Sequence, residues 1–238
     1  MRRFYASFEQ FQADKVLLNL DETQHLRDVL RLKIGEKVQV FDGTGKEFLC
    51  EIESVSKKET VLKISEEIAP FAPTSNLDLT LAVALLKGEK FDLVVQKAVE
   101  LGVTKLVPLN TKRADVKLKD SEKKIWRWRK IALEAAKQCG RADLMKIENL
   151  YDFEEFIKTS DGAKILFSER KGESFSAIKS SKKITAVIGS EGGWEDSEIE
   201  FAKLNGFQII TLKGRILRAE TAAIAIAAVL QNRFGDMN

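Results

Sequence analysis

Short apolar runs rich in β-branched residues alternate with helical patterns over the larger, C-terminal part of this chain of 238 residues. Strand-like runs occupy residues 79–86, 105–109, 146–150, 163–167, 184–188 and 208–212. Helical patterns occupy residues 91–101, 121–138, 199–204 and 221–230, with Ser121 as a candidate cap. Alternation of this kind predicts the α/β class, a mostly parallel sheet covered by helices. Ligands of such sheets bind at the carboxyl ends of the strands.

Two glycine-containing turns follow the last two strand-like runs. Residues 189–193 read Gly-Ser-Glu-Gly-Gly, and residues 214–221 read Gly-Arg-Ile-Leu-Arg-Ala-Glu-Thr. Glycines let a backbone approach a ligand closely and offer it N–H groups, so the two turns are candidates for the walls of one pocket. The spacing fits neither a P-loop nor a dinucleotide fingerprint. A tight turn without a ligand is an equal alternative for the first turn.

The charged residues of the second turn suggest chemistry. Arg218 is permanently cationic and can only orient or stabilise negative charge, which favours a functional role. Glu220 could accept a proton, or it could simply open the following helix, where acidic residues are favoured. The helix at residues 221–230 is apolar nearly all round. It is therefore predicted to be buried on every side, with a second subunit as a possible source of the missing cover.

The N-terminal part has a different pattern. Residues 37–41 and 47–52 are alternating runs around a glycine-containing turn, which predicts a hairpin, and residues 60–64 continue it. A short helix with Asp21 as its cap interrupts the strands. Pro70 and Pro73 mark a linker. We expect a small β-barrel-like domain at residues 1–70 and the α/β domain at residues 71–238.

Composition restricts the partners and the cellular compartment that can be expected. The formal net charge is only +3, so partners have to be inferred from local clusters of basic residues. Cys50 and Cys139 lack metal-ligand spacing, which favours free thiols in a reducing compartment and no metal site. No run approaches the roughly 18 apolar residues of a membrane span. We expect a soluble cytoplasmic protein without a membrane partner.

The ordered motifs resemble the RsmE family, the uridine N3-methyltransferases of small-subunit ribosomal RNA, in the SPOUT superfamily. The resemblance lies in residues 25–32, 96–103, 134–141, 189–193 and 214–222. Ser190 and Lys213 depart from the family pattern, where we expect proline and glycine, and Ser190 could loosen its turn. The resemblance implies a C-terminal SPOUT domain with a trefoil knot, a PUA-like N-terminal barrel and a homodimer formed through the knot domain.

The resemblance also implies S-adenosylmethionine as cofactor and 16S rRNA or the small ribosomal subunit as partner. The cofactor pocket would use Phe167, Gly189, Ser190, Glu191, Gly192, Leu212, Gly214, Ile216, Leu217 and Thr221. Arg218 would stabilise the uracil anion, and Glu191 and Glu220 are the carboxylates available as proton acceptors. The RNA contacts would be Arg2, Arg3, Arg27, Arg31, Lys33, Arg113 and Arg141.

Two other functions stay open from the residues alone. A non-catalytic RNA-binding or ribosome-assembly module could keep the same fold. A nucleotide-binding α/β enzyme could use the glycine turns for phosphate.

Overall fold

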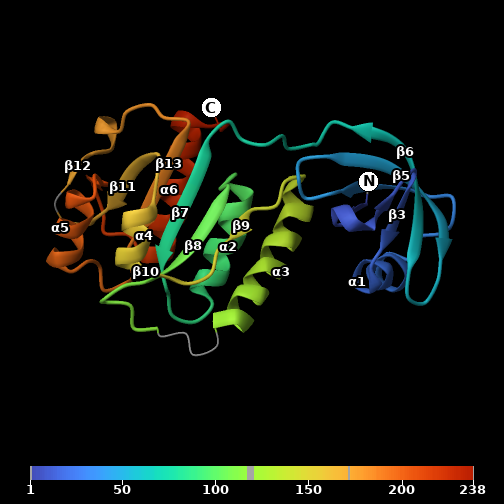
Figure 1. Cartoon of the computed structure of the whole chain (residues 1–238), viewed down its shortest axis with the longest axis horizontal. Helices are drawn as coiled ribbons and strands as arrows, with labels where there is room; N and C mark the ends of the chain where they lie inside the picture. The colour runs from blue at the N-terminus through green and yellow to red at the C-terminus, as the bar shows by residue number, and fades with distance from the viewer. Residues whose placement is uncertain (1, 117–120, 171, 238) are drawn as a thin grey trace. The chain divides into compact units, whose positions relative to one another are not determined.

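The computed structural model describes residues 2–116, 121–170 and 172–237 (Figure 1). The chain divides into two compact units. The first comprises Met1–Thr74 and Ala136–Leu144, and the second comprises Ser75–Ala135 and Met145–Asn238. The last turn of one long helix thus belongs to the first unit, which the sequence pattern did not indicate. In the described part of the chain, no helix is long and apolar enough to cross a bilayer.

The first unit is built on a six-stranded sheet with strand order β1-β4-β5-β6-β3-β2. Its strands are β1 (Arg3–Tyr5), β2 (Phe11–Gln12), β3 (Lys15–Leu18), β4 (Lys37–Phe41), β5 (Glu47–Val55) and β6 (Thr60–Ile68). The predicted hairpin is confirmed as β4 and β5, which pair antiparallel from Lys37 opposite Glu51 to Phe41 opposite Glu47. Within the described residues the end strands β1 and β2 do not pair with each other, so the sheet is an open half-barrel.

A short helical segment covers this sheet. Helix α1 (Leu20–Gln24) continues directly into a π-helical turn, His25–Val29, and Leu26 fills the core beneath it. The predicted cap at Asp21 is wrong. Asn19 caps the helix instead, because its side chain precedes the first turn and accepts the backbone N–H of Glu22 at 2.9 Å.

A buried ion pair links the start of the first unit to its hairpin. The Arg3 side chain is 10% exposed, and its Nε donates to Oε1 of Glu47, itself 2% exposed, at 2.6 Å. The same guanidinium donates to the carbonyl oxygens of Ala136 at 2.9 Å and Arg141 at 2.8 Å. Arg3 therefore satisfies a buried carboxylate and two carbonyls with one side chain.

The second unit is an α/β layer with strand order β10-β8-β7-β13-β11-β14-β12, in which β9 pairs with β8. All of these strand pairs are parallel, as predicted. Its strands are β7 (Asp78–Ala84), β8 (Lys105–Asn110), β9 (Lys146–Ile147), β10 (Tyr151–Asp152), β11 (Ala163–Phe167), β12 (Glu173–Ser174), β13 (Lys183–Ile188) and β14 (Gln208–Thr211).

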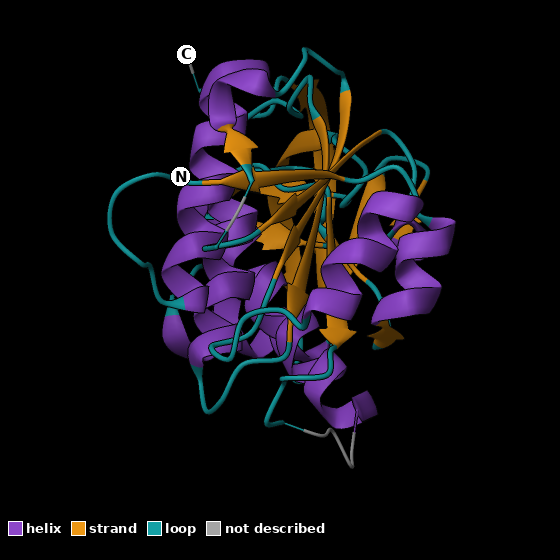
Figure 2. Cartoon of the chain, turned by 90° about the vertical axis from the view of Figure 1, so that its left-hand side faces the viewer, coloured by secondary structure: helices purple, strands orange, loops and turns teal. Residues whose placement is uncertain are grey.

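Helices cover both faces of this sheet (Figure 2). They are α2 (Lys90–Glu100), α3 (Ser121–Cys139), α4 (Phe153–Thr159), α5 (Asp196–Leu204) and α6 (Ala219–Phe234). Helix α6 packs against α2, β7 and β13, whereas α4 packs against β8 and α5. Since β14 lies beyond β11, the chain must return past β11 and β13 after Thr211 to reach the place of α6. The trefoil knot stays a prediction.

Helix α6 is less buried than its sequence predicted. Ala223, Ile226, Ala227 and Leu230 are buried, but Val229 is 40% exposed and Ile224 is partly exposed. The expectation of burial on every side is therefore wrong for the single chain, because only one face of α6 meets α2 and the sheet.

The Arg3–Glu47 pair yields the first prediction. Arg3→Met should lower the free energy of unfolding by about 3–5 kcal/mol, because Glu47 would be left as a buried, unpaired charge. Lys15→Met is the matched control, since Lys15 and Glu53 form a cross-strand pair of the same unit whose side chains are 42% and 44% exposed. The control should lose less than about 1 kcal/mol. Urea unfolding followed by circular dichroism measures both, and equal losses would contradict the burial argument.

Candidate functional site

The loops that follow β11, β13 and β14 enclose a cavity of about 400 Å³. Its volume lies in the range of small-molecule sites. The lining includes Phe167, Gly189, Ser190, Glu191, Gly192, Leu212, Gly214, Ile216, Leu217 and Arg218. Nine of the ten predicted cofactor residues therefore lie together. Thr221, the tenth, is exposed on α6 and is not in the lining.

Glycines in the turn after β13 are required by close packing. Gly193 has φ +67°, and a Cβ there would lie 2.6 Å from Oε1 of Glu169. A Cβ on Gly192 would lie 3.1 Å from the carbonyl oxygen of Arg113, which is backbone and cannot move aside easily. The turn is thus wedged between the loops after β8 and β11, and larger residues do not fit.

Trp194 anchors the end of the turn. Its ring is fully buried against Phe153, and its Nε1 donates to the carbonyl oxygen of Phe167 at 2.8 Å. A Cβ on Gly189 would lie 3.0 Å from this ring. Trp194 therefore fixes both the turn and the end of β11, two walls of the cavity.

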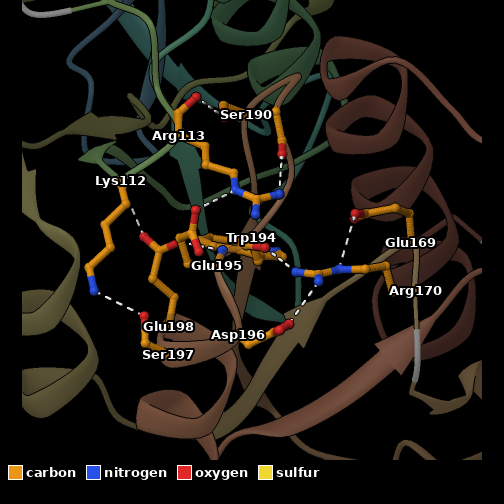
Figure 3. Close-up of polar contacts among 11 residues, drawn as sticks. Lys112, Arg113, Glu169, Arg170, Ser190, Trp194, Glu195, Asp196, Ser197 and Glu198 are labelled. Atoms are coloured by element: carbon orange, nitrogen blue, oxygen red, sulfur yellow. Dashed lines mark hydrogen bonds and ion pairs between the residues drawn. The ribbon is translucent and has the colours of Figure 1, made fainter.

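Two arginines from neighbouring loops hold the same turn (Figure 3). Arg113 donates to the Gly192 carbonyl at 3.2 Å and to Oε1 of Glu195 at 2.7 Å. Its guanidinium lowers the pKa of Glu195 through this hydrogen bond. Arg170 donates to the carbonyl of Trp194 and to Oδ1 of Asp196, the latter at 2.7 Å.

Ser190 strengthens this attachment. Its hydroxyl donates to the Arg113 carbonyl at 3.0 Å, and the residue is 7% exposed. This tether, which proline lacks, argues against the expectation that Ser190 loosens the turn.

The loop after β14 is open by comparison. Ile216 is 85% exposed and Leu217 36% exposed, although both line the cavity. Within the described part of the chain, residues 213–217 donate no backbone–backbone hydrogen bond. The loop therefore presents apolar side chains at the cavity, while Lys213 lies outside the lining.

Charged groups complete the site. Arg218 lines the cavity at the N-terminal cap of α6, and it is exposed. Glu191 lines the cavity and accepts a hydrogen bond from Nζ of Lys90 at 2.7 Å. Partial burial acts to raise the pKa of Glu191, but the hydrogen bond and charge of Lys90, together with backbone hydrogen bonds from Glu191 and Lys87, leave the pKa below its ordinary value. Glu220 is 8% exposed and is not in the lining.

The predicted RNA contacts divide into two groups. Arg141 is buried and pairs with Asp143 at 2.6 Å, and the Arg3 side chain is only 10% exposed and is engaged as described above. Their burial argues against the predicted phosphate contacts. Arg113 and Arg27 also have intramolecular partners, Arg27 donating to Asp28 and to the Ser56 and Lys57 carbonyls. The side chains of the remaining three are exposed: Arg2, Arg31 and Lys33.

Sequence reasoning missed three residues of this site: Lys90, Arg170 and Trp194. Lys90 follows β7 and Arg170 follows β11, so both stand just beyond the carboxyl end of a strand. This position just after a strand is the sequence signal that could have identified Lys90 and Arg170 as site residues. Which neighbouring loop each cation reaches depends on strand order, which the sequence pattern does not contain.

Comparison with known proteins agrees with this architecture. Residues 73–231 match the RNA methyltransferase domain and residues 18–65 match the RNA methyltransferase PUA domain. The ribosomal RNA small subunit methyltransferase E of Rickettsia conorii is 32% identical over 95% of this chain and 94% of its own length.

Two solved structures are similar over the whole chain. The ribosomal RNA small subunit methyltransferase E of Neisseria gonorrhoeae, bound to S-adenosyl methionine, has a TM-score of 0.92 and 31% identity, with 100% of both chains covered. A putative methyltransferase of Legionella pneumophila with bound SAM has a TM-score of 0.91 and 33% identity, with 98% of both chains covered. The chain therefore belongs to the RsmE family of RNA methyltransferases.

Proposed function

We propose that this protein transfers a methyl group from S-adenosylmethionine to N3 of a uridine in the 16S rRNA of the small ribosomal subunit. The cofactor, the methyl transfer and small-subunit rRNA are supported by the relatives, which carry these in their names and bound ligands. The observation that carries the proposal for the ring atom is the exposed guanidinium of Arg218 at the wall of the cavity.

The residues present fit an adenosyl cofactor. Glycines whose Cβ positions are already filled by neighbours leave main-chain atoms at the cavity wall. Exposed apolar side chains at Ile216 and Leu217 could cover a flat base, and Phe167 and Leu212 supply further apolar wall. When bound, this cofactor supplies an electrophilic methyl group on a sulfonium centre.

Arg218 would stabilise the negative charge that develops on the uracil ring during methyl transfer. Uracil N3 carries a proton and is a poor nucleophile while neutral. As N3 attacks and loses that proton, negative charge spreads onto the two flanking carbonyl oxygens. A fixed cation beside those oxygens stabilises the charge where it develops. Arg218 meets this demand because it cannot lose its own proton.

The carboxylates differ in their fitness to take the proton. Glu191 lines the cavity with a side chain that is 33% exposed, whereas the Glu220 side chain is 11% exposed and lies outside the lining. A proton acceptor must come within hydrogen-bond reach of its substrate, directly or through one water. Glu191 is therefore the better placed of the two to accept the proton.

The proposal includes RNA contacts made by exposed basic residues. Arg2, Arg31 and Lys33 would bind phosphates, since they are exposed basic residues of the PUA-matching unit or its start. Arg31 also has φ +53°, a rare conformation outside glycine that holds the chain in a sharp bend after the π-helical turn.

A homodimer would cover the half-exposed residues Ile224 and Val229 of α6.

The proposal is tested first by mass spectrometry of ribosomal RNA from cells that lack this protein. The missing modification should be one N3-methylated uridine of 16S rRNA, and purified protein with S-adenosylmethionine should restore it. A protein that never binds the cofactor, with or without RNA, would instead be the non-catalytic assembly module.

Arg218→Ala should reduce turnover by a factor on the order of 10²–10³ or more, the effect of removing one donor to a developing anion. Cofactor affinity measured by calorimetry should change little, because the proposed partner of Arg218 is the substrate anion. Lys213→Ala is the matched control, as Lys213 is an exposed cation of the same loop outside the lining. Turnover that survives in Arg218→Ala removes this role.

Arg31→Ala combined with Lys33→Ala should weaken RNA binding and reduce the slope of log affinity against log salt by about 2, one for each phosphate that is no longer neutralised. The control is Lys15→Ala with Lys63→Ala, which removes two cations of the same unit that lie opposite each other on β3 and β6; Lys63 is exposed and the Lys15 side chain is 42% exposed. Filter binding of a 16S rRNA fragment at several salt concentrations measures the slopes. Equal slopes in the two double variants would exclude Arg31 and Lys33 from the RNA surface.

A further inference from the structure

Lys90 joins two carboxylates that come from different parts of the second unit. It is the first residue of α2, and its Nζ lies 2.7 Å from Oε1 of Glu191 and 3.9 Å from Oε2 of Glu220. Glu191 belongs to the turn after β13, and Glu220 belongs to the first turn of α6. One ammonium group thus connects three segments at the carboxyl ends of the strands.

One carboxylate oxygen of Glu220, the buried residue of this group, has no hydrogen-bond partner in the described part of the chain. Oε2 of Glu220 is fully buried and makes no hydrogen bond within the described residues. A buried carboxylate without compensation is costly, and the structure provides the nearby ammonium charge of Lys90 and the N-terminus of α6 as compensation. Glu220 therefore attracts the Lys90 ammonium from the interior side.

The accessible member faces the cavity. Glu191 lines the cavity, and its Oε1 is occupied by the hydrogen bond from Lys90. The Lys90 side chain itself is 36% exposed, so its long stem would be free to take other rotamers if nothing held its end. The order of contacts runs from the buried carboxylate to the ammonium and on to the cavity carboxylate.

We propose that Lys90 is a positioning residue of this site, held by Glu220 and holding Glu191 at the cavity wall in its charged, proton-accepting form. The arrangement has a physical cost: a carboxylate stabilised in its charged form binds a proton weakly. Glu191 would therefore take the proton only as the new bond to N3 forms, and it would release that proton to water afterwards. The kinetic part of this inference rests on the proposed methyl transfer.

Each neighbouring loop also carries charged groups that could affect the protonation of Glu191. Lys87 of the loop after β7 pairs with Asp115 at 2.6 Å, and Glu169 of the loop after β11 lies against Gly193. Arg215 and Arg218 line the same cavity from the loop after β14. Among the ion pairs of the described residues, Lys90 is the cation that contacts Glu191 directly.

The sign of the pH effect follows from these contacts. Burial acts to raise the pKa of Glu191. The hydrogen bond from Lys90 is the largest contact that lowers it, followed by backbone hydrogen bonds and the Lys90 charge. Removal of Lys90 takes away the largest contact that lowers the pKa of Glu191, so this pKa should rise. A reaction that needs ionised Glu191 should then lose activity at a higher pH than in the wild type.

The test uses Lys90→Met, Lys90→Arg and the control Lys97→Met in the full-length protein. Lys97 is matched to Lys90: it lies on the same helix, its side chain is also 36% exposed, and it pairs with Glu100 at 2.8 Å. Carbon-13 NMR of labelled glutamate side chains, with Glu191 assigned by comparison with Glu191→Gln, gives the pKa of Glu191 in each protein. Calorimetry with S-adenosylmethionine and thermal unfolding verify that each variant is folded.

The expected result is a raised Glu191 pKa in Lys90→Met, a return towards the wild-type value in Lys90→Arg and no change in Lys97→Met. The acid limb of the single-turnover methylation rate should move to higher pH in Lys90→Met alone. An unchanged Glu191 pKa in a folded Lys90→Met protein overturns the positioning role. A raised pKa with an unmoved acid limb overturns the assignment of Glu191 as the acceptor.

Failure of the proposed function gives a different result. If the wild-type protein methylates no uridine but the NMR titrations shift as expected, methyl transfer to uridine is wrong and the Lys90 contact stands. If the wild type methylates uridine and neither the pKa nor the acid limb responds to Lys90→Met, the reaction stands and the role of Lys90 is wrong.

Discussion

Cations from neighbouring strand-end loops determine the shape of the turn after β13. Lys90 follows β7, Arg113 follows β8 and Arg170 follows β11, and each binds a carbonyl or carboxylate between Glu191 and Asp196. These loops meet because β13 lies between β7 and β11 in the sheet, with β8 next to β7. A glycine-rich turn is flexible by itself, and these contacts restrain it.

The cavity combines this fixed wall with an open one. Trp194 joins the fixed turn to the end of β11 through its hydrogen bond to Phe167. The loop after β14 has few internal hydrogen bonds and exposes Ile216. Such a division suits a site that must hold a cofactor in a defined place while a large RNA substrate approaches, since the ligand itself can order the open loop.

Much of this organisation could be predicted, and the failures have identifiable causes. The hairpin of β4 and β5, the parallel sheet and most of the cavity lining follow from local periodicity and from the rule that ligands bind at strand ends. Arg3 and Arg141 were predicted to bind RNA, but their side chains are at most 10% exposed and have internal carboxylate partners. Basic composition does not reveal whether a guanidinium has an internal carboxylate or carbonyl to bind.

The sequence by itself determined the class of the fold and the position of the two glycine turns, because both depend on residues close together in the chain. It also determined the permanent charge of Arg218. Only the tertiary structure decided which groups meet: Lys90 with Glu191 and Glu220, which are 101 and 130 positions away in the chain. The physical reason is that strand order brings these loops together, and strand order is a property of the whole sheet.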